Sequence, residues 1–474
     1  MIATTLAGLA DMLDGDLVLD SSRRADDAVS GRVDTDSRIV QPGGIFFALH
    51  GDTADGHDFA HAAVANGAAV LVVDRRLEID GGAGAGVAQI VVDDTLAGLA
   101  RLARRVVASV REAGHLRVVA ITGSNGKTTT KNMLRAILDR VGPTVAPQGS
   151  FNNHVGAPLS MLGVDESTRF LVVEMGAAGA GQIARLVDIA TPDISVVLKV
   201  GLAHAGEFGG IEATARAKAE IVTSLPSTSV AILNADDDRV AAMADLTEAR
   251  VVTFGLDDSA DIRIGDVEAT ATGTVFAVTV EDRERTVSMR ILGEHHAMNA
   301  TAAFTVAREL GLDLDDAIDA IESLERAERW RMELLRRPDG ATIINDAYNA
   351  SPDSTAAALK TLAQITRGGG RSTAILGEMA ELGEFAREEH DRIGRLVVRL
   401  NIARLVVVGS AARIIHSAAG LEGSWDGESV NVETADEAFA LVEPTLGEGD
   451  VVLVKSSKSA GLRFLGDRLA GVDG

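Results

Sequence analysis

The chain has 474 residues, which is too long for one ordinary hydrophobic core and predicts about three domains. Its formal net charge of -24 at pH 7 (45 basic and 69 acidic side chains) repels nucleic acid and disfavours a DNA- or RNA-binding role. The absence of cysteine excludes a disulfide framework, a thiolate metal site and a cysteine nucleophile.

Nothing in the sequence predicts a secretory leader or a membrane anchor. Residues 1–5 lack the charged region and apolar core of a signal peptide. No run of about 18 apolar residues is present that could span a bilayer. We therefore expect a cytoplasmic protein with no membrane partner, and we expect it to be a monomer.

Residues 1–113 alternate short apolar runs with helical stretches, which predicts a first α/β unit. Strands are expected at 45–49, 69–73 and 89–92, a glycine-rich loop at 78–88 and a helix over 96–110. Gly114 begins the expected linker to the next unit.

Residues 114–328 and 329–474 are expected to form two further α/β units. Runs that are apolar on both faces predict parallel strands covered by helices, and an alternating pattern over 262–292 predicts an antiparallel insert. The parallel strands are expected from 118, at 170–173, 194–198 and 230–233, and then at 342–344, 373–376, 405–408 and 451–454. The fold class is therefore α/β with three domains and right-handed crossovers.

The most informative segment is the glycine loop after the strand that begins at 118. The letters T-G-S-N-G-K-T-T at 122–129 lead into a helix, where backbone N–H groups and the helix dipole can hold phosphate oxygens. Lys127 would reach the β- and γ-phosphates, and the Thr128 hydroxyl would hold Mg²⁺. The general pattern has a glycine six positions before the lysine, where this chain has Ile121. We expect ATP or another nucleoside triphosphate to bind Gly123, Ser124, Asn125, Gly126, Lys127, Thr128 and Thr129.

Three further residues could share the same crevice, because ligands bind beyond the carboxyl ends of strands in open α/β sheets. Glu174 ends the strand at 170–173 and could hold Mg²⁺, with an ordinary strand-end carboxylate as the alternative. His204 follows the strand at 194–198, although Mg²⁺ prefers oxygen ligands and a structural histidine is the alternative. Lys218 lies in the helical pattern from 212 to 225, where a solvated charge is the alternative.

Two more segments carry candidate binding residues. Asn299 is expected to open a helix, so helix capping is the alternative to a binding role. The letters D-A-Y-N-A-S-P-D-S at 346–354 follow a strand and hold the only tyrosine of the chain. We interpret this segment, the tyrosine loop, as a recognition loop.

Taken together, these motifs resemble the Mur ligase superfamily over essentially the whole chain. T-G-S-N-G-K-T-T matches the short phosphate loop of that superfamily, and D-A-Y-N-A-x-P-D-S matches the branch that adds D-alanyl-D-alanine. The resemblance implies an N-terminal domain for the UDP end of the substrate, a central P-loop ATPase domain with a mostly parallel sheet, and a C-terminal Rossmann-like domain. Segments 34–38, 43–46 and 55–59 match the first of these, and the third would receive the dipeptide.

The resemblance also implies roles for individual residues. Lys127, Glu174, His204 and Lys218 would be catalytic, and Thr128, Glu174, His204 and Lys218 would hold two Mg²⁺ ions. Lys218 would be carbamylated, because a carbamate gives lysine two anionic oxygens for a metal. Asn299, Arg331 and Asp346 would bind the nucleotide, and Ser37, Arg38, Asn152, Asn153, Tyr348, Asn349 and Lys455 would bind the other substrates.

The implied reaction is ATP-dependent amide formation. The carboxylate of UDP-N-acetylmuramoyl-tripeptide attacks the γ-phosphate to give an acyl phosphate and ADP. The amine of D-alanyl-D-alanine then displaces phosphate, which yields the pentapeptide precursor of peptidoglycan. The alternatives are a sister Mur-type ligase or a folylpolyglutamate synthase-like ligase, against which the tyrosine loop argues, and more distantly a P-loop protein that binds ATP without ligase activity.

Overall fold

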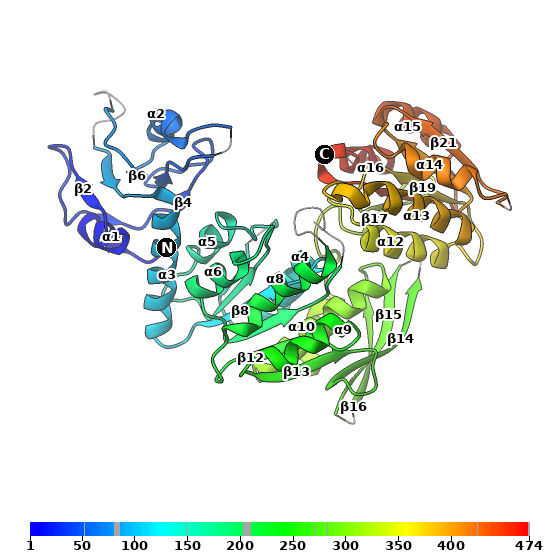
Figure 1. The fold of residues 1–474 in the computed structure, drawn as a ribbon, viewed down its shortest axis with the longest axis horizontal. Helices are drawn as coiled ribbons and strands as arrows, with labels where there is room; N and C mark the ends of the chain where they lie inside the picture. Colours follow the sequence, from blue (N-terminus) through cyan, green and yellow to red (C-terminus); the bar gives the residue numbers. More distant parts are fainter. Residues whose placement is uncertain are drawn as a thin grey trace.

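The computed structural model describes residues 1–472 except 52, 80–85, 148, 202–209, 271, 282 and 424. Within them the chain forms three units, each built around its own β-sheet (Figure 1). None of the helices in this part of the chain combines the length and apolar character needed to cross a membrane. The α/β class and the mostly parallel sheets predicted from the sequence are confirmed.

The first unit has a five-stranded sheet in the order β2-β7-β6-β5-β4, in which β2 alone is antiparallel. Its elements are β1 (Thr4–Thr5), α1 (Leu6–Leu13), β2 (Asp16–Val18), β3 (Ala28–Val29), β4 (Val33–Asp34), β5 (Ile45–Phe47), η1 (Gly56–Phe59), α2 (Ala60–Ala65), β6 (Val70–Val73), β7 (Ala88–Val91) and α3 (Thr95–Glu112). The three expected strands and the expected helix are present. The short strands β1 to β4 were not predicted.

The second unit has a nine-stranded sheet in the order β16-β15-β14-β13-β12-β11-β8-β10-β9. Its elements are β8 (Arg117–Thr122), α4 (Lys127–Leu138), β9 (Thr144–Val145), α5 (Gly156–Met161), β10 (Phe170–Glu174), α6 (Gln182–Ile189), β11 (Ile194–Val197), α8 (Ile211–Thr223), β12 (Val230–Asn234), α9 (Asp238–Ala241), η2 (Ala242–Leu246), β13 (Arg250–Gly255), β14 (Ile262–Thr270), β15 (Gly273–Val280), β16 (Arg283–Met289), α10 (Glu294–Glu309) and α11 (Leu314–Glu322). Strands β14, β15 and β16 pair antiparallel, which confirms the predicted insert.

The third unit has a six-stranded sheet in the order β17-β18-β22-β19-β20-β21, parallel except for the edge strand β17. Its elements are β17 (Glu333–Arg336), β18 (Thr342–Asn345), α12 (Pro352–Ile365), β19 (Ser372–Leu376), η3 (Gly383–Phe385), α13 (Ala386–Arg399), β20 (Arg404–Val408), α14 (Arg413–Gly420), β21 (Glu428–Val432), α15 (Ala435–Val442), η4 (Glu443–Thr445), β22 (Val451–Lys455), η5 (Lys458–Ala460) and α16 (Arg463–Ala470).

The central strand β8 shows why the apolar runs of the sequence become strands. Its successive side chains point to opposite faces of the sheet. Val118 and Ala120 join one cluster of buried side chains, and Val119 and Ile121 join another. Helices α4 and α10 cover the second face, whereas α5, α6 and α8 cover the first. Helix α3 of the first unit also packs against α5 and α6, so the first and second units share a buried core.

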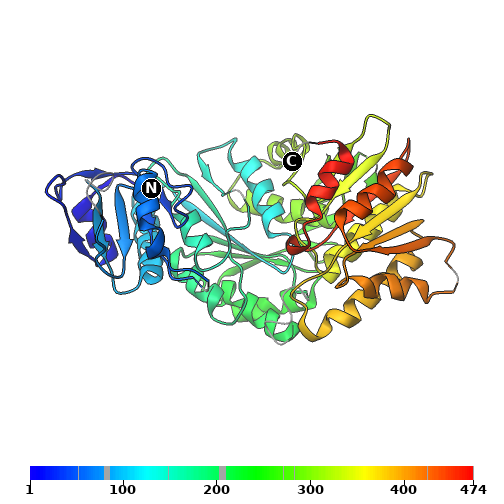
Figure 2. The same cartoon turned by 90° about the horizontal axis from the view of Figure 1, so that it is seen from above.

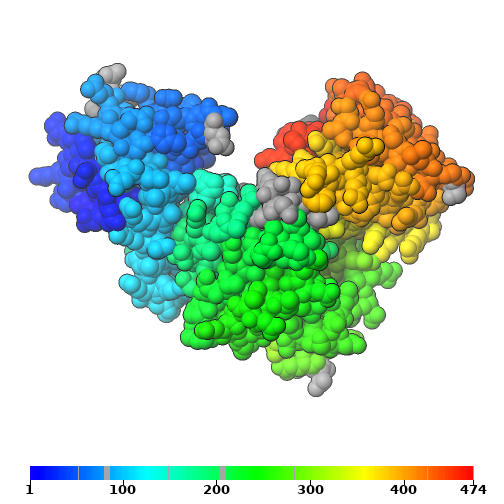
Figure 3. Space-filling view, in the orientation of Figure 1, coloured from blue at the N-terminus to red at the C-terminus, as the bar shows by residue number. Residues whose placement is uncertain are grey.

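The three units form an arc with the second unit in the middle (Figure 2). A wide cleft separates the blue first unit from the orange third unit, and the green second unit forms its floor (Figure 3). The carboxyl ends of β8 and β10 lead to the loops that the sequence predicts for phosphate and metal binding.

Candidate active site

The glycine loop joins β8 to the start of α4, and its shape depends on glycine at position 126. Gly126 precedes α4 with a φ of 89°, and a Cβ atom there would lie 2.4 Å from Asn299 Oδ1, so glycine is required on both counts. Ser124 fixes the loop to the segment that follows β11. Its backbone N–H donates to the carbonyl of Lys199 (2.8 Å), and its Oγ accepts from the N–H of Gly201 (2.8 Å).

Lys127 is the first residue of α4 and lies over the loop. Its Nζ donates to the carbonyl of Gly123 at 2.7 Å. Burial lowers the pKa of Lys127, an effect that the nearby carboxylate of Glu174 opposes. The Lys127 ammonium and the N–H groups of the first helical turn together suit a polyphosphate.

Glu174 ends β10 and lies beside the start of α4, as the strand-end argument predicted. It is 2% exposed, so its carboxylate needs bonded partners. Its Oε2 accepts from the hydroxyls of Thr128 (3.1 Å) and Ser150 (3.3 Å), and its Oε1 pairs with Lys131 Nζ (3.2 Å). The sequence analysis did not identify Lys131, although its position one helical turn after Lys127 places both on one face of α4.

Lys218 lies inside α8 and is 4% exposed. Burial, with a smaller contribution from the charge of Lys127, lowers the pKa of Lys218 to about 7. No described residue gives it a hydrogen bond or an ion pair. An amine of this kind is partly neutral at physiological pH, so the solvated-charge alternative is wrong. His204 lies outside the described residues.

Asn299 does not open a helix, because α10 begins five residues earlier, at Glu294 after Gly293. The prediction of the helix start is therefore wrong, and capping does not explain this asparagine. Asn299 is buried in the second turn of α10, against the glycine loop and within 3.2 Å of His296 Nδ1. Burial lowers the pKa of His295 to about 4 and holds the pKa of His296 well below its usual value, so the two rings, which lie 4.1 Å apart and tilted, are neutral at pH 7.

Arg331 and Tyr348 bring the third unit to the glycine loop. The Arg331 guanidinium lies 4.3 Å from the centroid of the Tyr348 ring and donates to Thr128 Oγ1 at 3.4 Å. The tyrosine loop also touches the glycine loop directly, because Ser351 Oγ donates to Asn125 Oδ1 at 3.1 Å. The predicted nucleotide residues of the two units therefore meet at one place.

Asp346 and Lys455 form the buried floor of the tyrosine loop. Lys455 Nζ lies 2.5 Å from Asp346 Oδ2 and 3.1 Å from the carbonyl of Asn349. The other carboxylate oxygen of Asp346 accepts from the N–H of Met332 at 3.1 Å. The pair therefore fixes the loop to the segment that carries Arg331.

Most of these side chains surround a cavity of about 330 Å³ between the second and third units, although Glu174, Lys131 and Lys218 are not among its lining residues. It is lined by Ser124, Asn125, Gly126, Lys127, Thr128, Thr129, Ser150, Asn152, His295, His296, Asn299, Arg331, Asp346, Tyr348, Asn349, Ser354, Glu381, Lys455 and Lys458. The structure thus brings together most of the predicted nucleotide residues with Asn152, Tyr348, Asn349 and Lys455. Three lining residues had no role predicted from the sequence, namely His295, His296 and Ser150.

Three predicted substrate residues do not line this cavity. Asn153 uses its side-chain oxygen to accept from the N–H groups of Val155 and Gly156, before α5. Ser37 and Arg38 lie in the first unit, where the Ser37 carbonyl accepts from Asn66 and the exposed Arg38 pairs with Asp36.

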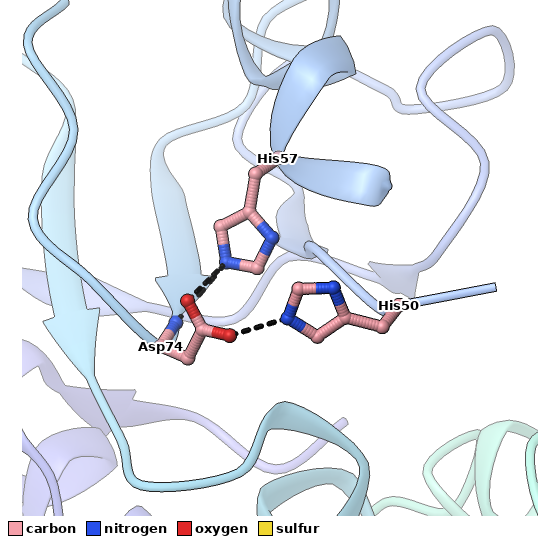
Figure 4. Close-up of side chains that lie close together, drawn as sticks. All are labelled: His50, His57 and Asp74. Atoms are coloured by element: carbon pink, nitrogen blue, oxygen red, sulfur yellow. Dashed lines mark hydrogen bonds and ion pairs between the residues drawn. The ribbon is translucent and has the colours of Figure 1, made fainter. Parts of the chain in front are cut away.

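His50, His57 and Asp74 form a second polar cluster, in the first unit (Figure 4). Their ligand atoms lie within 4.8 Å of one another, which raises the question of a metal site. However, His57 already uses both ring nitrogens, toward Asp55 Oδ1 (2.6 Å) and the N–H of Asp74 (3.2 Å). Arg75 forms ion pairs with the carboxylates of Asp55 and Asp74. The cluster is therefore a satisfied hydrogen-bond network that ties η1 to the end of β6.

Each of the three units matches a family model, and all three models belong to the Mur ligases. The chain matches three family models: Mur ligase family, catalytic domain, at residues 31–107; Mur ligase middle domain at 121–307; and Mur ligase, glutamate ligase domain, at 330–458.

Individual relatives agree with these matches. The UDP-N-acetylmuramoyl-tripeptide--D-alanyl-D-alanine ligase of Mycobacterium tuberculosis is 44% identical over 508 residues, which cover 100% of this chain and 99% of the relative. A crystal structure of MurF from Acinetobacter baumannii has a TM-score of 0.86 at 30% identity and covers 99% of both chains. A MurF ligase of Thermotoga maritima in complex with ADP has a TM-score of 0.80 at 27% identity, over 93% of this chain and 97% of that one.

Proposed function

The chain belongs to the Mur ligase family, and we propose that it joins D-alanyl-D-alanine to UDP-N-acetylmuramoyl-tripeptide with conversion of ATP to ADP and phosphate. The observation that carries this function is the cavity where the glycine loop of the second unit meets the tyrosine loop of the third. A nucleotide held by the first loop lies beside a recognition surface on the second. A sister ligase is not favoured, because full-length relatives at 44% identity share the dipeptide-adding activity in their names.

The residues of the cavity suit phosphoryl transfer to a carboxylate. Lys127 and the N–H groups at the start of α4 neutralise and orient the β- and γ-phosphates. The tripeptide carboxylate oxygen bonds to the γ-phosphorus as the bond to ADP breaks. The dipeptide amine then bonds to the acyl carbon, loses a proton, and phosphate leaves. Positioning and charge neutralisation are the protein's contribution, so no protein nucleophile is required.

The oxygen atoms of Thr128 and Glu174 fit Mg²⁺, which prefers hard oxygen ligands. Mg²⁺ bound there supplies positive charge against the phosphates. Asn299, Arg331 and Asp346 would hold the adenosine part of ATP, since they line the cavity beyond the glycine loop. His204 would join a second metal site, as the family resemblance implies.

We propose that Lys218 carries a carbamate. A carbamate forms when a neutral amine adds to the carbon of carbon dioxide and releases one proton to solvent, and the lowered pKa of Lys218 makes that neutral amine available near pH 7. The two oxygens of the carbamate would then complete the set of Mg²⁺ ligands. The test is a ¹³C NMR spectrum in ¹³C-bicarbonate: one carbamate signal is expected in the native chain and none in Lys218→Arg. Identical spectra would reject the modification.

The other substrates are assigned to the flanking units. We propose that residues 1–113 bind the UDP end through Ser37 and Arg38, that 114–328 bind ATP, and that 329–474 receive the dipeptide through Tyr348, Asn349 and Lys455. Asn152 and Asn153 would face the peptide arm. The enzyme would act in the cytoplasm as a monomer, a state that light scattering after size-exclusion chromatography measures directly.

The deciding assay is a substrate panel that follows ADP release. Turnover is expected with UDP-N-acetylmuramoyl-tripeptide and D-alanyl-D-alanine together, and not when either is omitted. Turnover with single amino acids alone would identify a sister ligase. ADP release that ignores both substrates would identify a nucleotide-binding protein without ligase activity.

A further inference from the structure

Lys131 is a buried cation whose role the reaction scheme leaves open. It lies on α4 with 0% of its surface exposed. Its Nζ contacts the carbonyl of Pro147 (2.5 Å), the carbonyl of Gly149 (2.6 Å) and Glu174 Oε1 (3.2 Å). The ammonium group therefore donates hydrogen bonds to the two carbonyls and forms a buried ion pair with the Glu174 carboxylate.

The two oxygens of Glu174 consequently have different surroundings. Oε1 faces Lys131. Oε2 faces the hydroxyls of Thr128 and Ser150, and both of these residues line the cavity. The carboxylate is therefore held in one orientation that turns a single oxygen toward the nucleotide site.

We propose that Lys131 is a positioning residue that reserves Glu174 Oε2 for Mg²⁺ and holds Pro147, Gly149 and Ser150 near the same carboxylate. The inference rests on the proposed role of Glu174 as a Mg²⁺ ligand. It adds a physical link between the metal site and the segment that leads to Asn152, whose side chain donates to Ser150 Oγ at 3.0 Å. Loss of the Lys131 side chain would therefore disturb the metal site and the position of Asn152 together.

Other side chains cannot replace this arrangement. Methionine has a similar length but would leave the buried Glu174 carboxylate without its cation and two carbonyls without a donor. Arginine keeps the charge, but its planar fork of five N–H donors does not converge on three acceptors around one nitrogen. Both changes would free the Glu174 carboxylate to rotate.

The first experiment is a crystal structure of the full-length wild-type protein with Mg²⁺ and ADP. The expected result has Glu174 Oε2 toward the metal and Oε1 still on Lys131. A structure with Oε1 toward the metal, and Lys131 turned away, would overturn the inference but leave Glu174 as a ligand. A metal that does not involve Glu174 would instead overturn the proposed ligand set.

The second experiment measures Mn²⁺ binding by electron paramagnetic resonance in the presence of ADP and without turnover. Lys131→Met is compared with Lys360→Met, a change at an exposed lysine on α12. We expect Lys131→Met to weaken Mn²⁺ binding by about tenfold or more, as removal of a group that orients a metal ligand does, and Lys360→Met to have no effect. ADP binding in EDTA should stay within about twofold of wild type, which separates metal positioning from general damage.

Unchanged Mn²⁺ affinity in a folded Lys131→Met protein would overturn the inference. Circular dichroism establishes whether that protein is folded. Lys131→Arg should weaken Mn²⁺ binding as Lys131→Met does, since charge alone does not restore the contacts of one nitrogen with two carbonyls and the Glu174 carboxylate. Wild-type affinity in Lys131→Arg would contradict this reasoning. If neither Lys131 variant folds, the crystal structure of the wild-type protein with Mg²⁺ and ADP tests the inference by itself.

Discussion

The lowered pKa of Lys218 predicts that replacing this lysine with methionine stabilises the protein at neutral pH. Burial at 4% exposure shifts the pKa from 10.5 to about 7. That difference corresponds to roughly 4 to 5 kcal/mol against the charged form in the folded state. Methionine has a similar length and carries no charge, so Lys218→Met removes this cost and keeps most of the packing.

The pH dependence has a definite sign. Between about pH 7 and 10.5 the unfolded lysine holds its proton while the folded one has lost it. The unfolded state then binds more protons, so wild-type stability rises with pH across this window. Below pH 7 folding carries the full cost of the buried charge, and above 10.5 the cost is gone. The advantage of Lys218→Met should therefore be about 3 to 5 kcal/mol at pH 6.5 and shrink to about 1 to 2 kcal/mol at pH 9.5.

Urea unfolding followed by circular dichroism measures this difference, in buffers free of carbon dioxide so that the lysine stays unmodified. Lys360→Met is the matched control, because Lys360 is exposed and its substitution should change stability little at either pH. A stability difference between wild type and Lys218→Met that is equal at pH 6.5 and 9.5 would refute the reasoning. Addition of bicarbonate, a source of carbon dioxide for the carbamate, should then change the free energy of unfolding of the wild-type protein and leave that of Lys218→Met unchanged.

Three further substitutions test the cavity. Gly126→Ala should weaken ADP binding by at least about tenfold in calorimetry, because alanine in a left-handed conformation costs about 1 to 2 kcal/mol and its Cβ would lie 2.4 Å from Asn299 Oδ1; wild-type affinity would contradict the close approach. Ser351→Ala should lower the free energy of unfolding by about 1 kcal/mol, since it removes the N-cap of α12 and the bond to Asn125; a neutral result in urea unfolding would reject the cap. Arg331→Ala should weaken ADP binding by about tenfold, because it removes the cation held over Tyr348; unchanged calorimetric affinity would remove Arg331 from the site.

The parts of the site that the sequence predicted are those set by local structure. The glycine loop follows from a strand, a loop and a helix in immediate succession, and Glu174 follows from its place at a strand end. Apolar runs located most of the central strands because both of their faces are buried, but the interior strand β13 was missed. The edge strands β2, β9, β17 and β21 were missed because they are short or partly exposed and lack such runs.

The parts that the sequence did not predict depend on contacts between distant elements. The sequence does not distinguish Lys131 from other helical lysines; the fold places its Nζ against Glu174 at the end of β10 and against the carbonyls of Pro147 and Gly149. The start of α10 was placed too late, at Asn299, because its N-cap is Gly293, which has no side chain to form a capping hydrogen bond. Packing creates these features, and no local pattern of residue types records them.

The second and third units share the walls of the cavity, so a bound nucleotide also helps to hold these two units together. The cavity walls come from the glycine loop and α10 of the second unit and from the tyrosine loop of the third, so a bound nucleotide must touch both. Binding free energy then also holds the third unit against the second, in addition to the existing contact between Ser351 and Asn125. Because the first and third units face each other across a cleft, the nucleotide fixes one wall of the space in which the peptide carboxylate and the dipeptide amine must meet (Figure 3).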